Sequence, residues 1–157
     1  MAVEFSPETL KRFEEIVGRY PKKEAAMLPV LYLAQEEFGY LSSDAIEYVA
    51  RLMDLSPARV YGVVTFYTML NMKPIGRHHV QVCRTLPCAL VGAENITAVL
   101  KSRLGIQVGE TTPDGKFTLS EVECLASCGS GPMMQINDDY YENLTQENIE
   151  EILARLK

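Results

Sequence analysis

The sequence has no tryptophan, only two histidines, and no apolar run long enough to cross a membrane. Its longest apolar stretch, 27–34, is interrupted by Pro29, whereas a membrane-spanning helix needs about 20 apolar residues. The first residues include Glu4, Glu8 and Lys11 and contain no apolar signal core, so we expect no export signal. These absences predict a cytoplasmic protein without direct membrane insertion.

Basic residues are outnumbered, with 15 lysines and arginines against 21 aspartates and glutamates and a net charge of −6. An acidic chain repels phosphate backbones and the predicted helices carry no Lys/Arg stripe, so no nucleic-acid partner is expected. No G-x-G-x-x-G motif follows a predicted strand, so we expect no dinucleotide site on this chain. The composition, 47% hydrophobic and 23% charged, is that of a globular protein with a packed core.

The first half of the chain, residues 1–73, is predicted to be a small helical bundle. Three start signals combine a serine with a proline or an acid, and they lie at Ser6-Pro7-Glu8, Ser43-Asp44 and Ser56-Pro57. A further helix is expected over about 23–38, ended by Gly39, with Pro29 either kinking it or starting it afresh. Short helices with short links favour a bundle.

The second half, residues 74–157, follows a Pro- and Gly-containing loop and has a different rhythm. Strands are expected near 79–82, 116–119 and 132–136, and helices over 89–104 and after Thr145. The order strand, helix, strand, strand, helix predicts an α/β layer of thioredoxin-like outline. The whole chain is therefore predicted as α+β, a helical bundle followed by a thioredoxin-like domain.

The four cysteines form two close pairs, C-x4-C at Cys83 and Cys88 and C-x3-C at Cys124 and Cys128. In a reducing compartment such cysteines are more often metal ligands than disulfides. Each pair is expected in a turn at the end of an element, and glycines follow the second pair, so backbone N–H groups can approach the sulfurs. We therefore predict one [2Fe–2S] cluster, with one pair on each iron.

Other uses of these cysteines make different demands. A thioredoxin-type dithiol needs C-x-x-C, and a plant-type ferredoxin needs a third cysteine where this chain has Val91. A Rieske centre needs two histidines among the cysteines, whereas His78 and His79 both precede Cys83. A four-thiolate zinc site, in an interaction module with no redox role, stays open on spacing alone.

Several motifs carry a resemblance to a known family. They are VCRTLPC at 82–88, EVECLASC at 121–128, GETTPDGKFTL at 109–119, EFGYL at 37–41 and VVTFY at 63–67. Together they resemble the family of the E subunit of bacterial NADH–quinone oxidoreductase (respiratory complex I), which is a thioredoxin-like [2Fe–2S] ferredoxin family. The resemblance covers nearly the whole chain.

What the resemblance implies is an electron-transfer subunit of an NADH dehydrogenase complex, in its peripheral arm. FMN and NADH are then expected on a flavoprotein partner subunit, close to the cluster, with further complex subunits nearby. The helical half is expected to help dock the partner, and the isolated chain is not expected to oxidise NADH. Related subunits of NAD-linked hydrogenases and formate dehydrogenases remain an alternative setting.

Two positions depart from the family pattern, and one charge stands out. Ala126 occupies a position that is usually glycine, which would matter if the backbone there has a positive φ. Gly131 stands where the family commonly has alanine. Arg84, beside Cys83, is the nearest cation in sequence and a candidate to oppose the negative charge of a reduced cluster.

Overall fold

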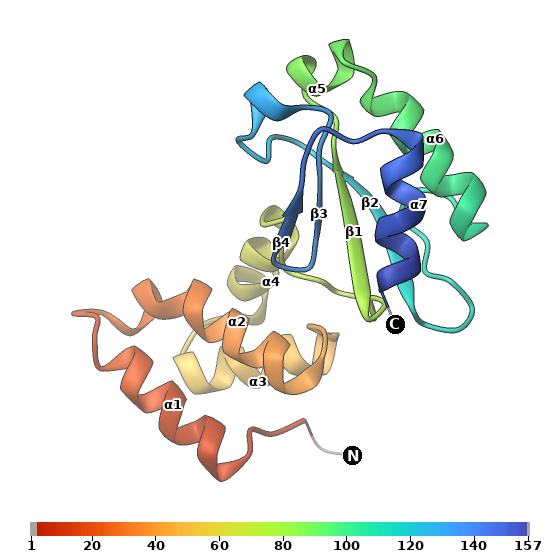
Figure 1. The fold of residues 1–157 in the computed structure, drawn as a ribbon. Helices are drawn as coiled ribbons and strands as arrows, with labels where there is room; N and C mark the ends of the chain where they lie inside the picture. The colour runs from red at the N-terminus through yellow and green to blue at the C-terminus, as the bar shows by residue number, and fades with distance from the viewer. Residues whose placement is uncertain (1–2, 157) are drawn as a thin grey trace. The chain divides into compact units, whose positions relative to one another are not determined.

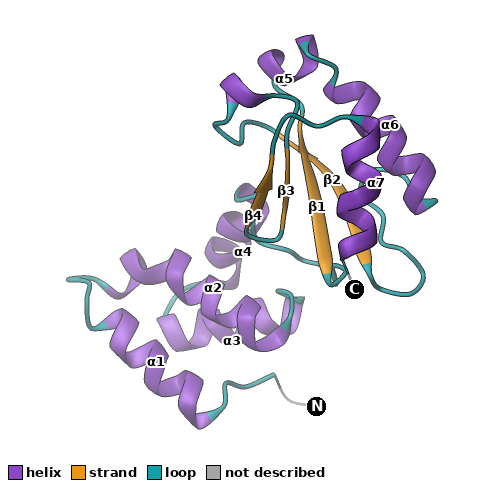
Figure 2. Cartoon of the chain, in the orientation of Figure 1, coloured by secondary structure: helices purple, strands orange, loops and turns teal. Residues whose placement is uncertain are grey.

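The computed structural model describes residues 3–156, which divide into two compact units (Figure 1). The first unit ends at Pro74 and the second begins at Ile75. Helices make up the first unit, and the second combines helices with a sheet (Figure 2). Within the described residues, no helix is long and apolar enough to cross a membrane.

Serine hydroxyls cap three of the helices in the first unit. Its helices are α1 Pro7–Val17, the 3-10 turn η1 Lys23–Ala26, α2 Met27–Phe38, α3 Ser43–Met53 and α4 Pro57–Phe66. The hydroxyls of Ser6, Ser42 and Ser56 each accept a hydrogen bond from the backbone N–H three residues on. The predicted helix over 23–38 is therefore a 3-10 turn followed by α2, and Pro29 lies in the first turn of α2, where its missing N–H costs nothing.

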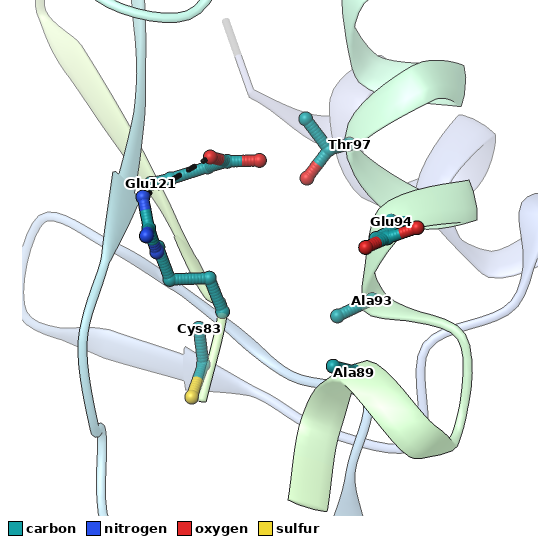
Figure 3. Close-up of a pocket in the computed structure, with 7 residues that line it drawn as sticks. Cys83, Ala89, Ala93, Glu94, Thr97 and Glu121 are labelled. Atoms are coloured by element: carbon teal, nitrogen blue, oxygen red, sulfur yellow. Dashed lines mark ion pairs between the residues drawn. The ribbon is translucent and has the colours of Figure 1, made fainter. Parts of the chain in front are cut away.

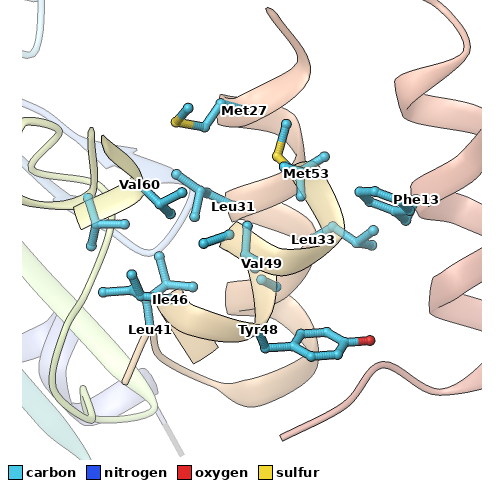
Figure 4. Close-up of a cluster of buried hydrophobic side chains, with 14 of the residues drawn as sticks. Phe13, Met27, Leu31, Leu33, Leu41, Ile46, Tyr48, Val49, Met53 and Val60 are labelled. Atoms are coloured by element: carbon cyan, nitrogen blue, oxygen red, sulfur yellow. The ribbon is translucent and has the colours of Figure 1, made fainter. Parts of the chain in front are cut away.

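The core of the first unit lies between these helices (Figure 4). Leu31, Val49 and Met53 are almost fully buried there. The segment before α1 is tied to this core through Phe5, whose ring stacks on Phe38 and whose backbone N–H donates to the Tyr48 hydroxyl at 2.9 Å. The apolar faces predicted from sequence thus close on one another.

The second unit is built on a four-stranded sheet of order β2-β1-β3-β4. Its strands are β1 His78–Cys83, β2 Phe117–Val122, β3 Met134–Ile136 and β4 Asp139–Tyr141. β1 runs parallel to β2 and antiparallel to β3, and β4 is antiparallel to β3. Helix α6, Ala93–Leu104, packs on β1 and β2, and α7, Gln146–Arg155, lies beside α6 (Figure 1).

Two sequence predictions for this unit are corrected. The single helix expected over 89–104 is two helices, α5 Leu86–Leu90 and α6, because Gly92 between them has φ 99° and breaks the helical backbone. Cys88 consequently lies inside α5 rather than before a helix. Strand β4 was not predicted, since three exposed or half-buried residues carry little apolar pattern.

The central strand brings the cysteine region together. Val80 and Val82 are buried against Leu119 and the α6 residues Ile96 and Leu100, which fixes β1 in the core. Cys83 is the last residue of β1, and its backbone N–H donates to the Met133 carbonyl at 3.2 Å. The end of β1 is thus joined directly to the segment that follows the second cysteine pair.

Candidate iron–sulfur site

The first cysteine pair is buried and held by regular structure. Cys83 ends β1 and Cys88 lies in α5, with exposed fractions of 2% and 1%. Ala93 and Met133 pack around them, with Leu125 partly buried against this group. The two thiols are close enough to interact directly, and neither forms a disulfide.

The second pair lies in an exposed loop after β2. Cys124 precedes the turn and Cys128 begins the short 3-10 turn η2, Cys128–Ser130. The backbone N–H of Ala126 donates to the Cys124 sulfur at 3.3 Å. Besides desolvation, the nearby Cys124 thiol helps raise the pKa of Cys128. Each pair predicted from spacing is therefore a pair in space.

The loop of the second pair lies against the first pair. The Cys83 sulfur is 3.1 Å from the carbonyl oxygen of Glu123, which precedes Cys124, and Leu125 packs against Cys83 and Cys88. Among residues 3–156, no three His, Cys, Asp or Glu side chains are placed to hold a single metal ion. A [2Fe–2S] cluster takes two thiolates on each of its two irons, and two adjoining thiol pairs fit that donor set.

Hydrogen bonds favour the thiolate of Cys83. Burial alone would raise its pKa, but the Thr85 hydroxyl, 3.2 Å from the sulfur, and the backbone N–H groups of Leu125 and Thr85 outweigh burial and lower the pKa. Thr85 begins α5 without capping it, since its hydroxyl lies at the sulfur instead. Oriented donors of this kind stabilise the anionic sulfurs of a cluster.

The thiols of Cys88 and Cys128 are harder to ionise in the absence of a cation. Burial, with the neighbouring Cys83 thiol, raises the pKa of Cys88 to about 11. Desolvation and the nearby Cys124 raise the pKa of Cys128. Thiolates crowded in this way repel one another, and a bound metal cation would remove that cost.

Comparison with known proteins identifies the family to which this chain belongs. The family model described as thioredoxin-like [2Fe–2S] ferredoxin matches residues 13–157. The chain belongs to the thioredoxin-like [2Fe–2S] ferredoxin family. It is 47% identical to the E subunit of the NADH-quinone oxidoreductase of Rickettsia conorii, over 98% of this chain and 93% of the relative. This confirms the resemblance that the motifs indicated.

One further relative and one solved structure each match most of this ferredoxin's length. "NADH dehydrogenase [ubiquinone] flavoprotein 2, mitochondrial" of Dictyostelium discoideum is 48% identical over 98% of this chain and 64% of that relative. A crystal structure of an NAD+-reducing [NiFe]-hydrogenase has a TM-score of 0.73 at 18% identity, over 83% of this chain and 22% of the hydrogenase chain. The hydrogenase likeness shows the fold alone.

The two departures from the family pattern have visible consequences in this ferredoxin. Ala126 has φ 60°, a left-handed conformation that glycine adopts without strain. At Gly131, an added Cβ would lie 3.3 Å from the Cys88 sulfur and 3.2 Å from a Val91 methyl. An alanine there would make tight contacts with both neighbours, so the Cys88 sulfur and Val91 would each have to shift by a few tenths of an ångström.

Arg84 forms ion pairs with two glutamates. Its guanidinium pairs with Glu123 at 3.6 Å and with Glu121 at 4.0 Å. Cys83, Arg84 and Glu121 help line a cavity of about 210 Å³ beside α6, into which Glu94 and Thr97 also project (Figure 3). The arginine thus balances two glutamates on the strand and loop that lead to Cys124.

The sequence did not indicate the groups that support the cysteines, although Ala126 was singled out for its backbone conformation. Thr85 and Ala126 contact the sulfurs through a hydroxyl and a backbone N–H. Glu142 contacts Ser127 and Ser130 in the second loop. A hydroxyl residue two positions after Cys83 is a local signal that could have been read, whereas the approach of Glu142 depends on the folding of β3 and β4.

Proposed function

We propose that this ferredoxin holds one [2Fe–2S] cluster on Cys83, Cys88, Cys124 and Cys128. The observation that supports the proposal is the contact between the loop of the second pair and the buried first pair, at the end of β1. When bound, such a cluster takes up and releases one electron at a time. The protein's own part is to hold the thiolates, to supply N–H and hydroxyl donors to them, and to shield the first pair from water.

We further propose that the chain is the E subunit of an NADH–quinone oxidoreductase, in its cytoplasmic peripheral arm. The support is the near-complete match, at 45–48% identity, to relatives that bear this name or that of the mitochondrial NADH dehydrogenase flavoprotein 2. Its partner would be the subunit that binds FMN and NADH. An equivalent subunit of an NAD-linked hydrogenase or formate dehydrogenase is the second candidate, favoured by the fold shared with the hydrogenase.

The two domains predicted from sequence, 1–73 and 74–157, would have different roles. The second unit would carry the cluster, and the helical unit would help dock the partner. Exposed apolar side chains support the second role, since Phe66 at the end of α4 is 76% exposed and Tyr61 and Met69 are also exposed. Such residues are typical of contact surfaces.

The test is to reconstitute the full chain with iron and sulfide. We expect a brown protein with two irons and two sulfides per chain and an EPR signal after reduction. Cys124→Ala should lose or severely damage the cluster, while Ser43→Ala, a change on the helical unit, should not. A full-strength spectrum in Cys124→Ala would refute the four-cysteine site, and a colourless, zinc-containing protein would favour the zinc module.

The partner is tested by mixing the loaded chain with the flavoprotein subunit from the same organism. We expect a stable complex by size-exclusion chromatography, and NADH-dependent reduction of the cluster only when the flavoprotein is present. Appreciable NADH oxidation by the isolated chain would show that it has a nucleotide site of its own.

A further inference from the structure

The loop that carries the second cysteine pair contacts a carboxylate from beyond β4. Glu142 directly follows β4, and its Oε1 accepts hydrogen bonds from the hydroxyls of Ser130, at 2.5 Å, and Ser127. The two hydroxyl oxygens lie 2.7 Å apart. One carboxylate oxygen therefore binds both Ser127 and Ser130, the two residues at the ends of the turn that includes Cys128.

The backbone around Glu142 is anchored to the same loop and to the core. The N–H of Asn143 donates to the Ser130 carbonyl at 2.7 Å, and the N–H of Leu144 donates to the Pro132 carbonyl at 2.9 Å. Leu144 is 4% exposed and packs in the core of the second unit. Glu142 thus reaches the loop from a segment that the core holds in place.

The second pair needs such support more than the first. Cys83 and Cys88 are buried and lie on a strand and a helix, whereas Cys124 and Cys128 are exposed. The segment between them, 125–127, has no helix or strand. Few buried contacts restrain it, so opening of the site would begin on this side.

We propose that Glu142 is a positioning residue that holds the Cys124–Cys128 loop in its ligand-binding conformation by fixing Ser127 and Ser130. The inference rests on the proposed function, because the conformation is that needed for the cluster. Hydrogen bonds to a charged acceptor are stronger than those between neutral groups, which suits a carboxylate for this task. The same carboxylate adds a negative charge beside an anionic centre, and this second effect can be separated from the first.

Three variants of the reconstituted full chain separate the two effects. Glu142→Ala removes the acceptor and the charge, and Glu142→Gln removes the charge but keeps a carbonyl acceptor. Asp138→Ala is the matched control, because it removes an exposed carboxylate from the same hairpin. The measurements are the rate of cluster loss to excess EDTA, followed by visible absorption, and the midpoint potential by EPR-monitored titration.

We expect Glu142→Ala to lose the cluster roughly tenfold faster than wild type, which corresponds to about 1.4 kcal/mol. Glu142→Gln should release it at a rate between those of wild type and Glu142→Ala, because its neutral acceptor makes weaker hydrogen bonds. Asp138→Ala should release it at the wild-type rate. The midpoint should rise in both Glu142 variants, since each removes a negative charge. The double variant Ser127→Ala, Ser130→Ala should release the cluster as fast as Glu142→Ala, and adding Glu142→Ala to it should give no further acceleration.

Wild-type release in Glu142→Ala would overturn the inference, and so would equally fast release in Glu142→Gln and Glu142→Ala, since hydrogen bonding would then be irrelevant. These outcomes all require a wild-type chain that holds the cluster. If the wild type takes up no cluster, it is the proposed function that fails, so the two failures are distinguishable.

Discussion

Replacing Ala126 with glycine should stabilise the second unit. Ala126 has φ 60°, and among residues 3–156 the other non-glycine residues with positive φ are asparagine or aspartate, which tolerate this conformation. The left-handed conformation costs an L-residue with a Cβ about 1–2 kcal/mol. Glycine avoids that cost but adds about 0.4–1 kcal/mol of unfolded-state entropy. With mid-range values of about 1.5 and about 0.7 kcal/mol, the net gain is about 0.8 kcal/mol.

The gain is best measured by native-state hydrogen exchange on the amides of β1 and β2, because these strands report on the second unit alone. In thermal melts the expected rise is about 3–6 °C, since about 1 kcal/mol shifts the midpoint of a domain of 60–100 residues by about 4–8 °C. Asn143→Gly, at φ 49°, is the control and should gain less than half as much. An unchanged or lowered stability in Ala126→Gly would refute the argument from backbone strain.

Three further predictions concern the potential and the acid stability. Thr85→Val should lower the midpoint of the cluster by roughly 40 mV, since the lost hydrogen bond to Cys83 is worth about 1 kcal/mol and about 59 mV corresponds to a factor of ten. Arg84→Ala should also lower the midpoint, because the two glutamates that it pairs with lose their counter-charge. Glu37→Gln should reduce the loss of stability in acid, because the backbone N–H of Ser6, with the Thr9 hydroxyl, lowers the pKa of Glu37.

The sign of the last effect follows from the depressed pKa. A carboxylate whose pKa is lowered in the folded state stabilises the protein when the pH is above the ordinary carboxyl pKa of 4.5. That stabilisation is lost as the pH falls through the folded-state pKa. Urea unfolding from pH 3 to 7 should therefore show a shallower acid slope in Glu37→Gln. For the potential, Thr85→Ser should restore the wild-type midpoint, and adding Glu123→Gln to Arg84→Ala should recover part of the shift. An unchanged midpoint potential in Thr85→Val would show that the Thr85 hydroxyl does not stabilise the negative charge of the cluster.

The features that sequence predicted well are local ones. The starts of α1, α4 and α7 depend on a hydroxyl and the next few residues, so Ser6, Ser56 and Thr145 could be recognised as caps without any tertiary information. The break at Gly92 was missed because an isolated glycine inside an apolar pattern is often tolerated within a helix. Strand β4 forms only because β3 pairs with it, and its residues are mostly exposed.

In the candidate site, too, the local features could be predicted from sequence and the long-range ones could not. The pairing of the cysteines could be predicted, because C-x4-C and C-x3-C place each pair within one turn. The supporting groups come from elsewhere: Glu142 is 12 residues from Ser130, and the Met133 carbonyl that receives the Cys83 N–H is 50 residues away in sequence. The positive φ of Ala126 could be framed as a question from sequence, but only the folded backbone answers it.

The burial of Cys83 and Cys88 and the exposure of Cys124 and Cys128 give the site a direction. Iron and sulfide, or a carrier protein that delivers them, would meet the exposed second pair first. The sheltered pair would then be reached last by the incoming group and released last when the centre is dismantled. Maturation and repair would therefore use one face of the protein, and a partner seated on that face would close the route in both directions.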